Sequence, residues 1–145
     1  MPVNDDRERM AVHTIARLAR LIERADTDLS LPQYRVLAMV GAGDERATRL
    51  ANRLNLAKPT ITAMVESLVE RGLIRREEVA GDRRAVSLQI TPAGEAALAS
   101  AEAAMIQRVE PVLERLDVAD REIVLCALES LQRSLDAGVT ANLRQ

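Results

Sequence analysis

The hydrophobic spacing changes its period about halfway along the chain, and this change limits the possible fold more than any other feature. From Ile61 to Val69, apolar residues recur at intervals of three and four, the pattern of a helix with one buried face. From Val86 to Ile90, apolar residues alternate with polar ones, which predicts a half-buried strand that residues 73–79 can pair with. The sequence therefore predicts a helix followed by a two-stranded ribbon.

Residues at the ends of these predicted elements agree with this interpretation. Pro59 suits the first turn of the helix, and Gly72 suits the left-handed position after its end. Residues 80–84 (AGDRR) predict a turn with two guanidinium groups at its tip. A helix followed by a basic-tipped ribbon is a winged helix-turn-helix pattern, in which the helix can enter a major groove and the tip a minor groove.

Helical patterns on both sides of this segment complete the predicted fold class, which is mainly α with a small two-stranded β-wing. A core with Tyr34 as its only aromatic residue must be built from aliphatic side chains, which favours helices. Ser30 and Gln33 form a capping box, Pro111 predicts a kink or break near residues 108–110, and Gly138 predicts the end of the last helix. Further helices are expected at about 5–25, 30–40, 46–54, 91–116 and 117–138, with a loose tail after them.

The charge is unevenly distributed along the chain. The whole chain carries a net charge of −2, yet residues 46–90 hold nine basic and five acidic residues, a net of +4. The remainder therefore carries −6. Because phosphate contacts depend on the local field, a basic lobe on an acidic body suits a DNA-binding module, although a solvated mixed surface is the alternative.

Several motifs together resemble the MarR family of bacterial transcriptional regulators, and the likeness covers nearly the whole chain. Each motif is weak alone, but the Asp-Arg-Arg tip followed by an alternating strand and Thr-Pro-x-Gly is fairly specific. The motifs are Leu50-Ala51 with Leu54, residues 56–62 (LAKPTIT), Leu68, residues 71–74 (RGLI), 81–84 (GDRR) and 88–94 (LQITPAG). One departure is Ala57, where the family commonly has a capping serine, and its loss costs the helix roughly 0.5–2 kcal/mol.

The resemblance implies one domain over residues 1–145 in a homodimer. Residues 30–94 would form the DNA-binding lobe, and residues 1–27 and 108–138 the dimerisation helices. Each lobe would read one half of a pseudo-palindromic operator, with half-sites about 34–36 Å apart. In this family an anionic aromatic or other apolar small molecule often binds between the dimer helices and the lobe, changes the lobe spacing and lowers DNA affinity. Candidate lining residues for such an effector are His13, Arg17, Tyr34 and Met105.

The candidate DNA-contacting residues are polar, basic or small and lie on the predicted reading helix, its preceding helix and the wing. Threonine hydroxyls and Lys58 can reach bases or phosphates, while Pro59 and Ala63 can contact thymine methyl groups. The resemblance places Arg84 in the minor groove, with Asp82 holding an arginine in position. Glu66 shares the helix face without a clear role. The full set is Arg49, Arg53, Lys58, Pro59, Thr60, Thr62, Ala63, Arg75, Asp82, Arg83 and Arg84.

The same sequence gives no support for catalysis, a cofactor or a metal site. His13 and Cys126 are the only histidine and cysteine, and no Ser-His-acid set or phosphate-binding loop is visible. The default for Cys126 is a buried structural thiol. A single cysteine and no apolar run near ~18 residues predict a cytoplasmic protein without a membrane span.

Two other functions fit the same pattern. A winged helix can dock a protein partner in place of DNA, and salt-steep DNA affinity distinguishes the two cases. The chain could also bind DNA architecturally, without sequence preference, and a specificity ratio near one would indicate this. The sequence does not define the operator, the regulated genes, the effector or the sign of regulation.

Overall fold

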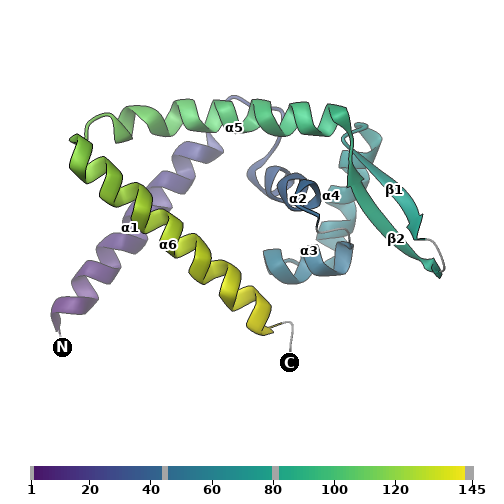
Figure 1. Cartoon of the computed structure of the whole chain (residues 1–145), viewed down its shortest axis with the longest axis horizontal. Helices are drawn as coiled ribbons and strands as arrows, with labels where there is room; N and C mark the ends of the chain where they lie inside the picture. Colours follow the sequence, from purple (N-terminus) through teal and green to yellow (C-terminus); the bar gives the residue numbers. More distant parts are fainter. Residues whose placement is uncertain (1, 44–45, 80–81, 143–145) are drawn as a thin grey trace. The chain divides into compact units, whose positions relative to one another are not determined.

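The computed structural model describes residues 2–43, 46–79 and 82–142, although the side chains of residues 2–4, 48, 79, 82–85 and 138–142 are not described. The chain divides into two compact units, residues 1–108 and 109–145, which are described separately below. Figure 1 shows the elements in chain order: α1 (Pro2–Glu23), α2 (Leu31–Gly41), α3 (Ala47–Leu54), α4 (Lys58–Glu70), β1 (Ile74–Val79), β2 (Asp82–Ile90), α5 (Pro92–Leu113) and α6 (Val118–Asn142). The predicted fold class, mainly α with a two-stranded wing, is confirmed.

The core of the first unit is aliphatic and joins four helices to the wing. In this core α2 packs against α4 and β2, α3 packs against α4, and α4 packs against β1. Each buried leucine or isoleucine contributes about 1.5–3 kcal/mol relative to an exposed one. The largest fully buried side chains of this core are Val36, Leu37, Leu50, Ile61, Leu68 and Ile74.

Side-chain caps begin three of the helices, as the sequence predicts. The Ser30 Oγ accepts a hydrogen bond from the Gln33 N–H (3.3 Å), and the Gln33 Oε1 accepts one from the Ser30 N–H (3.0 Å), which completes the capping box of α2. The Thr91 Oγ1 accepts from the Gly94 N–H at the start of α5. The Asp117 Oδ1 accepts from the Asp120 N–H at the start of α6 (2.8 Å).

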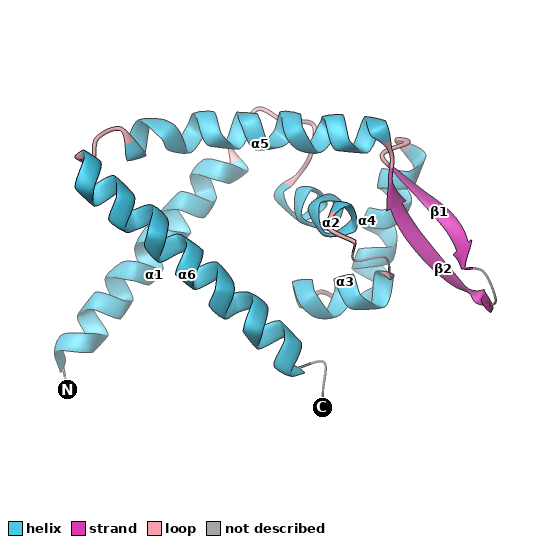
Figure 2. Ribbon diagram, viewed as in Figure 1, coloured by secondary structure: helices cyan, strands magenta, loops and turns pink. Residues whose placement is uncertain are grey.

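The wing is an antiparallel pair of strands (Figure 2). Its register shifts between Glu78 and Val79. Ile74 pairs with Ile90 at the base, and regular pairing continues to Glu78 opposite Val86. Beyond that point Val79 pairs with Asp82, so β2 has three more residues than β1 between these two pairs. Such an irregularity is a β-bulge, which bends and twists a strand locally.

Two predictions about where helices are interrupted need correction. A kink or break was expected near residues 108–110, but the helix does not break there, because α5 continues through Pro111 to Leu113. The kink stays a prediction. Pro111 leaves the Gln107 carbonyl without its helical partner, but only two residues of α5 follow it, so little of the helix depends on this interruption. The expected stop at Gly138 is also wrong, since α6 continues to Asn142. A glycine inside a helix costs only about 1 kcal/mol relative to alanine, which does not end a helix by itself.

The second unit consists of the end of α5 and the 25-residue helix α6. Several large apolar side chains of α6 are exposed in the single chain: Val118, Ile123, Leu125, Leu128, Leu131 and Leu135. In the described part of the chain, no helix has the length and apolar character needed to cross a membrane.

Candidate DNA-binding interface

The helix α4 has one buried and one exposed face, as its sequence predicts. Ile61, Val65 and Leu68 are buried in the core. The six predicted groove-facing residues are all exposed: Lys58, Pro59, Thr60, Thr62, Ala63 and Glu66. This face carries one cation, two hydroxyl groups, two small apolar contacts and the Glu66 carboxylate. All but the carboxylate are suited to base edges and phosphates.

The two ends of α4 are fixed differently. Ala57 occupies the N-cap position and makes no side-chain hydrogen bond, so the missing cap predicted from the sequence is confirmed. At the other end Gly72 adopts a left-handed conformation (φ 71°), and the Leu73 N–H donates to the Leu68 carbonyl at 2.9 Å. This 6→1 hydrogen bond satisfies a carbonyl that would otherwise lack a partner. The C-terminal end of α4 is therefore more strongly held than its N-terminal end.

Thr62 makes a hydrogen bond within α4 itself. Its hydroxyl donates to the Lys58 carbonyl at 2.9 Å. The hydroxyl proton is thus engaged in the helix, while the oxygen lone pairs of Thr62 can accept from a base or from water. Its role as a DNA contact stays a prediction.

The turn between α3 and α4 depends on an asparagine in a left-handed conformation. Asn55 has φ 51° and ψ 44°, and the Leu56 N–H donates to the Ala51 carbonyl (3.1 Å). Asparagine tolerates this conformation better than most residues with a side chain. The sequence thereby sets the direction in which the chain enters α4.

Three predicted phosphate contacts lie on α3 and β1. Arg49 is exposed and Arg53 is half-buried on α3. Arg75 is exposed on β1, and its Nη2 lies 2.8 Å from the Glu77 Oε1. Because this ion pair is solvent-exposed, it is weak and can be exchanged for a phosphate contact.

The sequence suggested that the wing arginines lie in a turn between the strands, but the structure places them in a strand. Asp82, Arg83 and Arg84 belong to β2, and Arg83 and Arg84 fall in its bulged segment between the Val86 and Asp82 pairs. Asp82 pairs with Val79, and this cross-strand pairing is not visible in the local sequence. The side chains of all three residues lie outside the described part, so their contacts stay a prediction, as does the conformation of residues 80–81.

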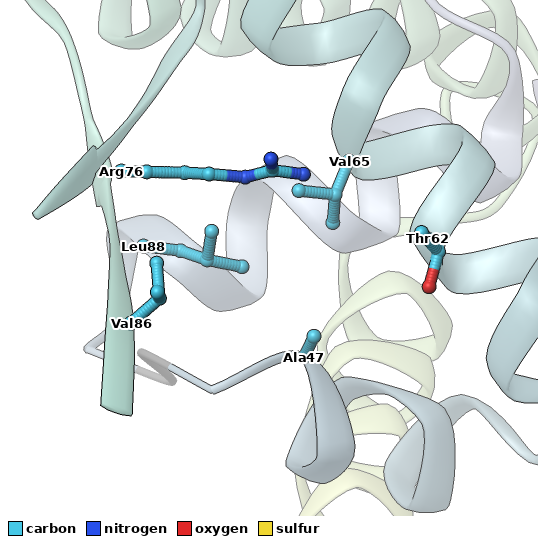
Figure 3. A pocket seen from close by; sticks show the side chains of 6 residues that line it. All are labelled: Ala47, Thr62, Val65, Arg76, Val86 and Leu88. Atoms are coloured by element: carbon cyan, nitrogen blue, oxygen red, sulfur yellow. The ribbon is translucent and has the colours of Figure 1, made fainter. Parts of the chain in front are cut away.

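A small cavity of about 210 Å³ lies between α3, α4 and the wing (Figure 3). Figure 3 shows the Arg76 side chain extending from β1 across this cavity toward Val65 of α4. Sequence reasoning counted Arg76 as a basic residue but did not include it in the site. The alternation of side chains along a strand could have identified this position, because it places Arg76 on the same face of β1 as the buried Ile74. In the structure Arg76 pairs with Leu88. The cavity is lined by Ala47, Thr62, Val65, Arg76, Val86 and Leu88.

The predicted effector-lining residues are differently exposed. His13 and Arg17 are exposed on α1, and Met105 of α5 is buried in the core. Tyr34 of α2 is half-buried, and its hydroxyl donates to the Glu102 Oε1 at 3.2 Å. None of the four lines the cavity beside α4. Their role in effector binding stays a prediction.

Cys126 is exposed in the single chain, which corrects the expected buried thiol. It lies on α6, where its Sγ is 3.6 Å from the Glu122 Oε1. An apolar helix face indicates that the face is covered in the native protein. It does not indicate whether the cover comes from the same chain or from another molecule, and for this reason the prediction was wrong. Among the residues that the structure describes, no group of three His, Cys, Asp or Glu side chains could hold a metal ion.

Known proteins share both sequence and structure with this chain. The family model described as "MarR family" matches residues 27–85. A Thauera aromatica protein named for transcriptional regulation of the hcr operon is 34% identical over 96 residues, 66% of this chain and 57% of its own length. The HTH-type transcriptional repressor YetL of Bacillus subtilis is 27% identical over 110 residues, 74% of this chain. The aligned part thus spans 57% and 66% of these two relatives.

A solved structure agrees with the same fold. The crystal structure of CouR from Rhodococcus jostii, bound to p-coumaroyl-CoA, has a TM-score of 0.70 with this chain at 22% identity. The match covers 91% of this chain and 93% of CouR. At this level of identity the comparison concerns the fold, which extends over nearly all of both chains.

Proposed function

We propose that this chain belongs to the MarR family of winged-helix transcriptional regulators and is a homodimeric repressor of a pseudo-palindromic DNA operator. Each α4 helix inserts into the major groove of one half-site, and each wing reaches the adjacent minor groove. A small molecule bound near α1, α2 and α5 lowers the affinity for DNA. The protein acts in the cytoplasm and carries out no reaction of its own.

The exposed face of α4 is the observation that carries this proposal. A helix with a fully buried stripe needs no particular residues on its outer face, yet α4 presents Lys58, Thr60 and Thr62 there. Arg49 of α3 and Arg75 of β1 add exposed cations on the neighbouring elements. Together with the net charge of +4 over residues 46–90, these groups give the lobe the field that phosphate binding requires.

Exposed apolar residues outside the lobe support the homodimer. Met10 of α1 is 66% exposed, and Leu135 of α6 is 67% exposed. Val12 and Ile15 of α1 are also exposed, as are the six apolar residues of α6 given above. An exposed apolar helix face of this kind normally marks an interface, and a second copy of the chain offers matching faces.

The proposed effector is a small carboxylate or thioester with an apolar body. CouR, which shares the fold, was solved with p-coumaroyl-CoA bound. Here the exposed guanidinium of Arg17 can bind a carboxylate or phosphate, and the half-buried Tyr34 provides apolar surface. Met105 is buried in the core and is the least accessible of the proposed lining residues. His13 is the fourth proposed lining residue.

Selection of bound DNA from a random duplex pool tests the regulatory function. We expect enrichment of a two-fold-symmetric site, and the selected site is then titrated at 50 and 200 mM salt. A dimer that makes ~6–10 phosphate contacts loses about 10³–10⁵ in affinity over this range. Strong salt-sensitive binding without enrichment would indicate an architectural binder. No binding at low salt would favour a module that docks a protein partner.

The dimer is tested separately, by sedimentation of the free protein. We expect a dimer at micromolar concentration, because the apolar faces of α1 and α6 are exposed in the single chain. Leu135→Glu is the matching variant, and we expect it to weaken the dimer, since a charge on an apolar interface opposes association. A wild-type monomer at this concentration would contradict the proposed assembly.

A further inference from the structure

The end of α4, the base of the wing and the start of α5 meet at Thr91. The Thr91 hydroxyl donates to the Gly72 carbonyl at 2.6 Å and accepts from the Gly94 N–H at 3.0 Å. The Thr91 N–H donates to the Leu73 carbonyl at 3.1 Å. A single residue therefore links the loop that ends α4 to the first turn of α5 through three hydrogen bonds.

The backbone of α5 is packed closely against the backbone that follows α4 at this point. A Cβ atom on Gly94 would overlap the carbonyl oxygen of Leu73 and would lie 2.8 Å from the Ile90 Cγ1. The first turn of α5 thus rests directly on the backbone that follows α4. Gly72 is itself fixed by the hydrogen bond from its N–H to the Val69 carbonyl (2.9 Å). We call Gly72, Leu73, Thr91 and Gly94 the α4–α5 joint.

Most of the other contacts between α5 and the lobe are apolar, and Ala101 and Met105 of α5 are buried in the aliphatic core of the first unit. Apolar packing depends little on angle, whereas hydrogen bonds weaken steeply when they are misaligned. One hydrogen bond lies outside the joint, from the Tyr34 hydroxyl to Glu102, and it ties α2 to α5. The hydrogen bonds of the joint tie the end of α4 itself to α5, so the angle between these two helices is set mainly there.

A small change of this angle has a large effect at the DNA-reading end of α4. This helix has 13 residues, so its N-terminal turn lies about 20 Å from the joint. A rotation of about 10° there moves that turn by about 3 Å, which is close to the ~3.4 Å rise of one base pair. Loosening the joint would thus alter half-site spacing by about one base pair.

We propose that Thr91 is a positioning residue that sets the half-site spacing accepted by the dimer. It acts through its hydrogen bond to the Gly72 carbonyl and does not touch DNA. This inference rests on the proposed function, in which two α4 helices read one operator. It adds the statement that spacing selectivity is determined at the α4–α5 joint and not only by the residues that contact bases.

Three substitutions at Thr91 distinguish its role as the N-cap of α5 from its hydrogen bond to Gly72 in the joint. Thr91→Ser keeps both hydroxyl hydrogen bonds. Thr91→Asp keeps an acceptor for the Gly94 N–H, and hence the cap of α5, but cannot donate to the Gly72 carbonyl. Thr91→Val removes both. The matched control is Ser30→Ala, which removes the cap of α2 in the same unit and leaves the joint intact.

The measurement is the affinity for the selected operator divided by the affinity for the same operator with one base pair inserted between its half-sites. We expect wild type, Thr91→Ser and Ser30→Ala to discriminate at least tenfold, and Thr91→Asp and Thr91→Val to discriminate less than threefold. Dimerisation and melting of Thr91→Asp should match those of Ser30→Ala. A wild-type ratio in Thr91→Asp would overturn the proposal, as would an equal loss in Ser30→Ala. Thr91→Asp decides the question if Thr91→Val does not fold.

A second measurement needs neither DNA nor a dimer. Two spin labels are attached at Ala63→Cys on α4 and Ala99→Cys on α5 in a Cys126→Ser background, and labelled chains are diluted with unlabelled ones. We expect Thr91→Asp to broaden the distance distribution and Thr91→Ser to leave it unchanged. If wild type binds no duplex, the proposed function fails while this distribution still tests the joint. An unchanged width in Thr91→Asp would show that the joint does not fix the angle.

Discussion

Tyr34 of α2 donates a hydrogen bond to Glu102 of α5 across 68 positions of sequence, with 3.2 Å between the Tyr34 Oη and the Glu102 Oε1. Partial burial, the negative charge of Glu102 and this hydrogen bond all raise the pKa of Tyr34 above its ordinary value of 10.0. The contact therefore gives α2 and α5 a bond whose strength depends on pH.

The pH dependence of stability follows from this shift. Because the folded pKa is raised, the folded state binds the tyrosine proton more tightly than the unfolded state does. The stability so gained is fully present below pH 10 and is lost as the pH rises through the folded pKa. Glu102→Gln removes the charge, so we expect the pKa of Tyr34 to move toward its ordinary value. An ultraviolet titration of this single tyrosine measures it, and identical curves for the two proteins would contradict the assignment.

Arg84→Ala tests the wing. We expect operator affinity to fall at least tenfold, which corresponds to about 1.4 kcal/mol, because a guanidinium in a narrow minor groove contributes both charge and fit. Dimerisation and melting temperature should not change. Arg115→Ala, an exposed arginine between α5 and α6, is the control that removes the same charge elsewhere. Wild-type affinity in Arg84→Ala would remove the wing from the mechanism.

Cys126 should react slowly with alkylating reagents despite its exposure. Local desolvation and the nearby Glu122 carboxylate raise the pKa of the Cys126 thiol, and only the thiolate is nucleophilic. Glu122→Gln should therefore speed alkylation by iodoacetamide at neutral pH, followed by mass spectrometry. Glu114→Gln changes a carboxylate at the end of α5 and should have no such effect. Equal rates in the three proteins would exclude Glu122 as the cause.

Asn55 should tolerate glycine but not a β-branched residue. Its left-handed conformation costs roughly 1–2 kcal/mol for an ordinary L-residue, so we expect Asn55→Val to lower the free energy of unfolding by at least that amount. Asn55→Gly should be close to neutral. Asn52→Val on the exposed side of α3 provides the comparison, with an expected change of a few tenths of a kcal/mol. Urea denaturation measures all three, and equal losses at positions 52 and 55 would contradict the role of the turn.

The sequence predicted those features that depend on local chemistry. The buried stripe of α4 and the caps Ser30, Thr91 and Asp117 follow from residue spacing and from side chains that bond their own backbone. Features that depend on distant pairing were missed. The start of β2 at Asp82 requires its partner Val79, and local residues there resemble a turn.

Arg76 and Cys126 show a second limit of sequence reasoning. The period of β1 places Arg76 on the inner face of the wing, but only the packed structure has a cavity for its side chain to cross. An amphipathic α6 predicts that its apolar side is covered, and it does not say whether by this chain or by another. The burial of Cys126 was therefore not determined by the residues around it.

The unequal ends of α4 have a consequence for how an operator would be recognised. Its last turn is tied to Thr91 through Gly72, while its first turn begins at Ala57 without a side-chain cap. The amides of the first turn of α4 should therefore exchange with solvent faster than those of its last turn in the free protein. DNA would complete this turn as it binds, so recognition and the last step of folding would coincide. Restoring a serine at position 57 would then stabilise the free protein without an equal gain in affinity for the operator.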